Sequence, residues 1–425
     1  MSTRPEPAPW GFTDGLPPRG FAREDSAKAV RALEDGVREL TRAAREDKAR
    51  AGAGAVELIE RIDVAVACVD GSSGALPRAI RRALDAAIEL LIAADVDEAR
   101  HDAWLARLGA RFTGRAQAER ALERVGQSLA YETGHVHERL GERWGELCKT
   151  RARADAWAQR LTAAVRLAWI EGAPAPGALA CLSSLLAAGQ HEALFSLLEL
   201  RTIATWPERQ FGVRALAAAG RLDEAIAYAQ HSNPLGHRRE LDIARTCEEL
   251  LLAAGERGRA YAEFAAAANT RQNCLQTFKA LCARYPEHEP GTILADLIAH
   301  KPGEEGKWFA TARTLRFFEL AAEIAARAPC DPKTLNRAAR ERLEVDPSYA
   351  LELSLASLRW IIEGHGVEIG AADVLRAHGL ATRAGMLLGG GSRLMARIRA
   401  EIRGLCELPA PAAGWVRELL ADELE

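Results

Sequence analysis

The sequence predicts an all-α protein, and three observations support this fold class. Ala, Leu, Arg and Glu, which are good helix formers, recur throughout the 425 residues, whereas runs of β-branched residues are scarce. Apolar residues recur at spacings of three and four along most of the chain, as on the buried face of a helix. Hydrophobic residues make up 48% of the chain, so most of it can bury a core. The predicted architecture is an irregular N-terminal helical domain followed by an α-solenoid-like stack of helix-turn-helix pairs.

The first segment, residues 1–24, carries five prolines and three glycines. Such a composition disfavours a long helix or a central strand. We therefore expect a leader segment that is flexible or lies along the surface of the protein. Its aromatic residues, Trp10, Phe12 and Phe21, are candidates for pinning the leader to the body of the protein.

Residues 25–172 are predicted to form the irregular helical domain. Val30, Leu33, Val37 and Leu40 make one apolar stripe of a first helix. No clean repeat is present in this region, which is why the domain is predicted to be irregular. Further helical patterns cover residues 55–70, 75–95, 97–111, 116–131 and 135–171.

Residues 173–386 are predicted to form a helical-repeat array. The near copies "LLAAG", "LAAAG" and "LLAAG" end at Gly189, Gly220 and Gly255, and each is followed by a second helical pattern. Glycine suits the left-handed residue that ends a helix, so each motif predicts helix, turn, helix. The stretch "GRLDEAIAYAQ" that begins at Gly220 resembles the turn and second helix of a tetratricopeptide repeat.

Later helix starts in this array are marked by Asp-Pro pairs. Asp331 and Asp346 each precede a proline, which predicts an Asp N-cap with Pro in the first turn. Residues 349–362 are apolar on more than one side, which predicts a buried helix. The chain is then predicted to end in C-terminal helices within 387–425, after a break at "GGGS", residues 389–392.

Composition narrows the possible partners and compartment. The net charge of −3 argues against a general nucleic-acid binder, which would be strongly basic. The eight cysteines include no C-x-x-C pair, and no N-terminal apolar segment resembles a secretion signal. No uncharged helical run reaches the roughly 20 residues that a membrane span needs. A cytoplasmic protein with reduced thiols and no membrane segment is therefore predicted.

The stretch "AHKPGEEGKWFATARTL", residues 299–315, raises the question of a phosphate-binding loop. A Walker-type loop needs four residues between its first glycine and the Gly-Lys pair, followed by Ser or Thr. Here two residues separate Gly303 from Gly306, and Trp308 follows Lys307. The two glutamates between the glycines suit the first turn of a helix and would repel phosphate. The stretch is therefore interpreted as the start of a helix.

Other chemical motifs are incomplete. Residues 389–393, "GGGSR", have a shape that can hold an anion ahead of a helix, but no strand precedes them. "HVHE", residues 135–138, places two histidines on nearly opposite sides of a helix, so they would not share a metal. "HEALF", residues 191–195, has Phe195 where a zinc-protease motif needs its second histidine. The sequence predicts no catalytic residue, metal or cofactor.

Six candidate partner-binding residues lie in the later helix pairs: Lys307, Trp308, Arg313, Arg340, Trp360 and His365. Trp308 and Trp360 either fill gaps between helices or anchor a partner, because Trp and Arg dominate binding energy at interfaces. His365 lies in the Gly-rich loop 363–370, which can carry such contacts. A cleft that gathered Lys307, Arg313, Arg340 and His365 would instead indicate an anion site.

Three stretches, "PGEEGKWFATAR", "CDPKTLNRAARE" and "LASLRWIIEGHGVEIGAADVLRA", occur in this order. Together they resemble a group of uncharacterised bacterial α-helical-repeat proteins across residues 175–385. The sequence departs from that group at His365 and Val367, where the resemblance implies aromatic residues. The group implies no activity or catalytic residue.

Two functional hypotheses follow. The first is a non-enzymatic interaction scaffold that binds a protein or peptide partner on its helical-repeat surface. The alternative is an enzyme or nucleotide-responsive regulator with an anion site near Lys307 or the 389–393 loop.

Overall fold

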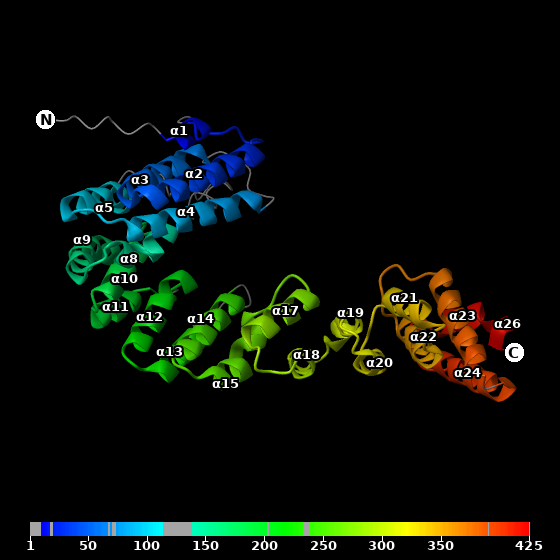
Figure 1. Ribbon diagram of the computed structural model, residues 1–425. Coiled ribbons are helices and arrows are strands. Elements are labelled where there is room, and N and C mark those ends of the chain that lie inside the picture. The colour runs from blue at the N-terminus through cyan, green and yellow to red at the C-terminus, as the bar shows by residue number, and fades with distance from the viewer. Residues whose placement is uncertain are drawn as a thin grey trace. The chain divides into compact units, whose positions relative to one another are not determined.

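The computed structural model describes residues 10–17, 20–66, 69, 74–113, 138–201, 204–232, 239–389 and 391–424. Every regular element within these ranges is a helix, which confirms the predicted all-α class (Figure 1). Among the helices so described, none combines the length and the apolar character that crossing a membrane requires. The chain divides into two compact units, residues 1–239 (unit 1) and 240–425 (unit 2), and this boundary falls inside the range 173–386.

Unit 1 is built from helices that pack mostly on their neighbours in the chain. Pairs in contact include α2 with α3, α3 with α4, α9 with α10 and α12 with α13. The helices of unit 1 are α1 (Phe12–Gly15), α2 (Ser26–Glu46), α3 (Lys48–Ala65), α4 (Ala75–Ala93), α5 (Glu98–Thr113), α8 (Trp144–Leu147), α9 (Arg151–Ile170), α10 (Ala178–Ala187), α11 (His191–Leu198), α12 (Trp206–Ala218) and α13 (Leu222–Gln230).

The N-terminal segment is fixed to unit 1 by its aromatic residues. Trp10 and Phe12 are buried in the core of the unit, and Phe21 packs against that core. The Glu39 carboxylate in α2 accepts hydrogen bonds from the backbone N–H groups of Gly11 (2.8 Å) and Phe12 (3.0 Å). The expected pinning of this segment is therefore present, while residues 1–9 lie outside the described residues.

The helical pattern at 135–171 does not form one helix. Short α8 ends at Leu147, and Lys149 adopts a left-handed backbone with φ 59° before α9 begins. The Thr150 side chain then accepts a hydrogen bond from the Arg153 N–H (3.3 Å) and caps α9. The chain therefore starts a new helix at this point, because a Thr cap competes with helix continuation. The patterns at 116–131 and "HVH" at 135–137 lie outside the described residues.

The repeated glycines form the helix-ending turns that the sequence predicts. Gly189, Gly220 and Gly255 have φ values of 71°, 74° and 81°, and each separates a longer helix from the next one. A side chain at such a φ is strained, so glycine is the residue that allows the chain to reverse here.

Unit 2 continues the arrangement of neighbouring helix pairs. Its helices are α14 (Glu240–Ala253), α15 (Arg257–Ala260), η1 (Tyr261–Ala265), α16 (Ala266–Ala268), α17 (Cys274–Arg284), α18 (Pro290–Ala299), η2 (Glu305–Trp308), α19 (Phe309–Thr314), α20 (Phe318–Arg327), α21 (Pro332–Arg342), α22 (Pro347–Ile362), α23 (Ala371–Leu387), α24 (Gly391–Cys406), α25 (Ala413–Leu419) and α26 (Ala421–Leu424). Helix α14 packs on the segment from α15 to α16, α17 on α18, and α22 on α20, α21 and α23.

The two Asp-Pro helix starts form as predicted. The Asp331 carboxylate accepts a hydrogen bond from the Thr334 N–H (2.9 Å) at the start of α21. Asp346 does the same for the Tyr349 N–H (3.1 Å) at the start of α22. Helix α22 buries residues on several sides, as its all-round apolar sequence predicts.

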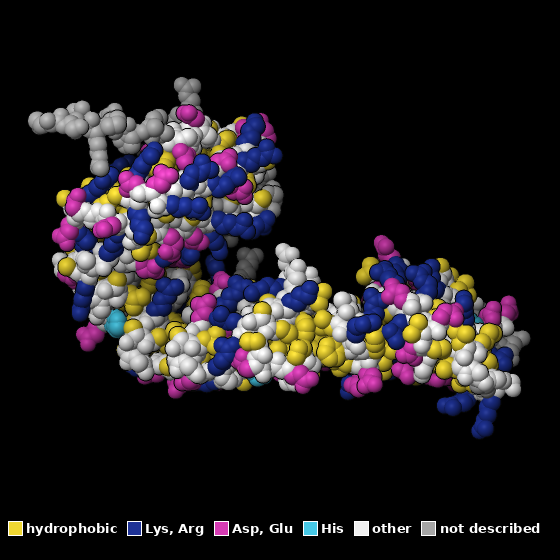
Figure 2. All heavy atoms as spheres, viewed as in Figure 1, with side chains coloured by type: hydrophobic (Ala, Val, Ile, Leu, Met, Phe, Trp, Pro, Cys, Tyr) yellow, Lys and Arg dark blue, Asp and Glu magenta, His cyan; other side chains and the backbone are white. Residues whose placement is uncertain are grey.

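Surface charges of both signs are interspersed over the visible face of each unit (Figure 2). Within unit 2, Lys and Arg side chains gather over α14 and α17 in this view. A pocket lies in the same part of unit 2.

Candidate partner-binding pocket

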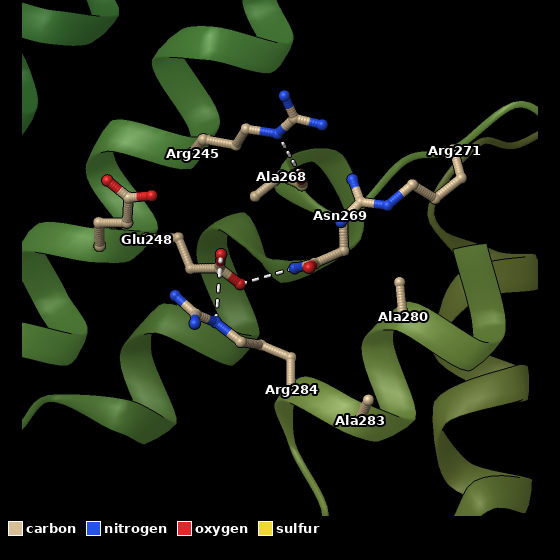
Figure 3. Close-up of a pocket in the computed structure, with 9 residues that line it drawn as sticks. Arg245, Glu248, Ala268, Asn269, Arg271, Ala280, Ala283 and Arg284 are labelled. Atoms are coloured by element: carbon tan, nitrogen blue, oxygen red, sulfur yellow. Dashed lines mark hydrogen bonds and ion pairs between the residues drawn. The ribbon is translucent and has the colours of Figure 1, made fainter. Parts of the chain in front are cut away.

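A pocket with a volume of about 450 Å³ opens in unit 2 between α14, the turn after α16, and α17 (Figure 3). This volume is in the range of pockets that hold small ligands or peptide side chains. Three arginines, two glutamates, one asparagine and three alanines line it: Arg245, Glu248, Glu249, Ala268, Asn269, Arg271, Ala280, Ala283 and Arg284.

The turn that supplies Asn269 follows an unusual helix. Residues 257–268 run without interruption, but Tyr261–Ala265 form a π-helical turn, in which each hydrogen bond spans one residue more than in an α-helix. Such turns are rare and are frequent at functional sites. The Asn269 amide donates a hydrogen bond back to the Ala265 carbonyl (2.9 Å), so the end of this helix fixes the asparagine.

A buried carboxylate forms the base of the pocket. The Glu248 side chain on α14 is only 3% exposed, and its Oε1 accepts hydrogen bonds from the Asn269 amide (2.7 Å) and the Tyr285 hydroxyl (2.8 Å). Burial raises the pKa of Tyr285, and the hydrogen bond to Glu248 raises it further, so the phenol stays a donor. Because a buried carboxylate needs such donors, this network fixes the positions of α14, α16 and α17 relative to one another.

Arg284 reaches into the pocket from the last residue of α17. Its Nε lies 3.8 Å from Oε2 of Glu248, a loose ion pair (Figure 3). The Arg284 carbonyl accepts a hydrogen bond from Arg257, whose guanidinium also pairs with Glu287. A cation at a helix C-terminus stabilises the last carbonyl groups, so Arg257 fixes the end of α17.

The other two arginines extend over Ala268 and Asn269 from opposite sides in Figure 3. Arg245 donates from Nε to the Ala268 carbonyl (3.0 Å), and Arg271 donates from one terminal nitrogen to the Thr270 carbonyl (3.2 Å). Each guanidinium has five N–H donors, so most donors of both groups have no hydrogen-bond partner among the described residues. These donors are available to an acceptor that enters the pocket.

The Glu248 network leads to a stability prediction. Glu248→Gln should lower the free energy of unfolding of unit 2 by about 2 kcal/mol, because hydrogen bonds to a charged acceptor are replaced by weaker ones. The neighbouring Glu249→Gln is the matched control, because Glu249 is exposed and its replacement should change stability by less than about 0.5 kcal/mol. Urea unfolding, with hydrogen exchange of residues 265–285, measures both; equal effects of the two variants would contradict the assigned role of Glu248.

No family model and no curated protein matches this chain. The similarity to bacterial helical-repeat proteins therefore stays a prediction.

Lys307 and Trp308, in the stretch considered as a phosphate loop, lie in different surroundings. The Lys307 side chain is 64% exposed and pairs with Glu304 at 2.8 Å, while Trp308 is buried in the core of unit 2. The helix expected to start here begins with the single 3-10 turn η2 and continues as the short α19. The stretch therefore packs a tryptophan and starts a helix, as its sequence pattern predicts.

The other predicted residues have separate neighbours. Arg313 pairs with Glu341 at 2.7 Å, and Arg340 is exposed on α21. The Trp360 side chain is 2% exposed. The exposed His365 packs against it in an edge-to-face arrangement, with the two ring centroids 5.6 Å apart. No contact joins Lys307, Arg313, Arg340 and His365 among the described residues, and none of the six predicted residues lines the pocket.

Fewer residues of the 389–393 stretch form a loop than the sequence suggests. Gly389 and Gly391 have positive φ values, and α24 already begins at Gly391, while residue 390 lies outside the described residues. In the part of the chain that the structure describes, no three His, Cys, Asp or Glu side chains are grouped as metal ligands.

Proposed function

We propose that the protein is a non-enzymatic interaction scaffold that binds a protein or peptide partner through unit 2. The observation that carries this proposal is the convergence of Arg245, Arg271 and Arg284 on one open pocket with alanine walls. Arginine is among the residues that dominate interface energies, and stacked helix pairs offer surfaces for extended segments.

The fixed contacts of the pocket support binding more than catalysis. Of the described residues that line it, the acid–base candidates are Glu248 and Glu249. Glu248 already accepts hydrogen bonds from Asn269 and Tyr285, which hold it in a structural role. Pre-organised side chains of this kind increase affinity, because less conformational freedom is lost on binding.

The proposal also assigns the protein to the cytosol. The cysteines in the described part of the chain are unpaired, and most of them are buried. Unpaired thiols suit a reducing compartment.

Site-specific photo-crosslinking in the native host tests this function. We expect a photo-crosslinking amino acid in place of Ala283, on the pocket wall, to attach the full-length protein to a discrete partner protein. Ala396 on α24, also exposed in unit 2, is the matched control position and should give no such adduct. Adding Arg271→Ala should reduce the Ala283 adduct roughly tenfold, because a charge-assisted contact is lost.

Two results would contradict the proposed function. One is that no protein is attached at Ala283; the other is that the Ala283 and Ala396 positions give the same adducts. An adduct at Ala283 that is insensitive to Arg271→Ala would contradict the contribution of Arg271 to binding.

A further inference from the structure

We propose that the pocket in unit 2 recognises a single carboxylate side chain, Glu or Asp, in an extended segment of the partner. This inference rests on the proposed function and specifies the chemistry that the scaffold selects.

The charge of the pocket matches a monoanion. Its three guanidinium groups and two carboxylates leave one net positive charge. Glu248 is buried beside Arg284 and neutralises the charge of its guanidinium. The exposed Glu249 neutralises part of the combined charge of the other two arginines, Arg245 and Arg271. One entering carboxylate therefore neutralises the site.

A phosphate group matches less well. A phosphoserine carries about 1.5 to 2 negative charges at neutral pH, so it would leave the site with excess negative charge. Glu248 cannot move away, because Asn269 and Tyr285 hold it at the base of the pocket. Like charges in a partly desolvated site repel strongly, so the two glutamates select against a dianion.

The donors available in the pocket fit a carboxylate. Arg245 and Arg271 each donate a side-chain hydrogen bond to a backbone carbonyl, and other N–H groups of each guanidinium remain for a ligand. A guanidinium binds the two oxygens of a carboxylate through parallel hydrogen bonds. Because the Ala268 carbonyl holds Arg245, this guanidinium needs little ordering when the ligand binds.

The walls of the pocket leave room for a peptide main chain. Ala268, Ala280 and Ala283 have the smallest side chains that carry a Cβ, and two of them lie on the same face of α17 at a spacing of three. An extended segment can therefore approach the helix while its acidic side chain reaches Arg245 and Arg271. Selectivity would come from the carboxylate and additional affinity from contacts of the segment with the neighbouring helices.

Oriented peptide libraries test this inference on the full-length protein. Random peptides of one length would carry glutamate, glutamine or phosphoserine at a fixed central position. We expect the glutamate library to be retained roughly tenfold better than the glutamine library, and better than the phosphoserine library, because only glutamate supplies a monoanionic acceptor. Arg271→Ala should bring the glutamate-to-glutamine ratio close to one, whereas the exposed Arg376→Ala on α23 should leave it unchanged.

The outcomes separate this inference from the proposed function. Equal retention of the glutamate and glutamine libraries, or stronger retention of the phosphoserine library, would overturn the carboxylate assignment. If the photo-crosslinked partner were still found at Ala283, the scaffold function would stand and only the ligand class would fail. A glutamate preference that Arg376→Ala abolished as fully as Arg271→Ala would also overturn the assignment, because binding would then follow total charge.

Discussion

Replacing Trp360 with alanine is expected to lower the free energy of unfolding of unit 2 by about 3–5 kcal/mol, the usual cost of deleting a buried indole. The Trp360 side chain is 2% exposed and lies on the heavily buried helix α22. Its Nε1–H donates to the Ala325 carbonyl at 2.8 Å, and the adjacent Arg359 donates to the Ala326 carbonyl at 3.1 Å. These two carbonyls are in the last turn of α20, where no helical N–H remains to satisfy them. Trp360 thus fills space and also caps a neighbouring helix.

The two roles of Trp360 can be separated. Trp360→Phe keeps most of the ring but leaves the Ala325 carbonyl without its donor, which should cost about 1–3 kcal/mol. Calorimetry and hydrogen exchange of residues 318–362 measure both variants; for Trp360→Ala we expect the melting temperature to fall by roughly 10 °C. If Trp360→Ala changed neither stability nor exchange in α20, the assigned packing role would be wrong.

Gly306→Ala is expected to destabilise unit 2 by about 3 kcal/mol, at the upper end of the cost of overpacking. A Cβ at position 306 would lie 2.7 Å from the carbonyl carbon of Pro329 and closer still to its oxygen. Real Cβ atoms do not approach backbone atoms so closely, so either η2 or the segment before α21 must shift. The glycine that resembles part of a phosphate loop is thus required for close backbone packing.

Gly379→Ala is the matched control for Gly306→Ala. Gly379 is exposed in the middle of α23 in the same unit, and nothing lies within 4 Å of a Cβ built there. Alanine is the better helix former, so this variant should be more stable by about 0.5–1 kcal/mol. Urea unfolding measures the stability of both variants. A Gly306→Ala protein as stable as the parent would show that the Pro329 backbone can move away from a Cβ at position 306 without cost.

Local features of the fold could be predicted because their causes are local. The turns at Gly189, Gly220 and Gly255 and the caps at Asp331 and Asp346 each depend on residues within a few positions of one another. The left-handed residue Lys149 could not be predicted, because nothing in its own side chain favours a positive φ.

The pocket could not be predicted, because its residues come from distant positions and each is ordinary in its own helix. Arg245, within α14, and Arg284, at the end of α17, look like solvated residues of amphipathic helices. Nothing in the sequence around Glu248 indicates that its side chain is buried. Only Asn269, which follows a run of alanines in "FAAAANTRQN", marks the end of a helix in the sequence. The predicted residues Trp308 and Trp360 are conspicuous in the sequence because they are large, but both side chains are buried and fill the core.

The π-helical turn Tyr261–Ala265 determines where the helix 257–268 can change in length. Its five residues complete about the same rotation as four α-helical residues, so the extra residue is accommodated within the turn. A chain with one residue fewer within 261–265 would form a regular α-helix there and keep Asn269 beside Glu248. A deletion in the α-helical residues on either side would instead rotate Asn269 by about 100° around the helix axis, away from Glu248.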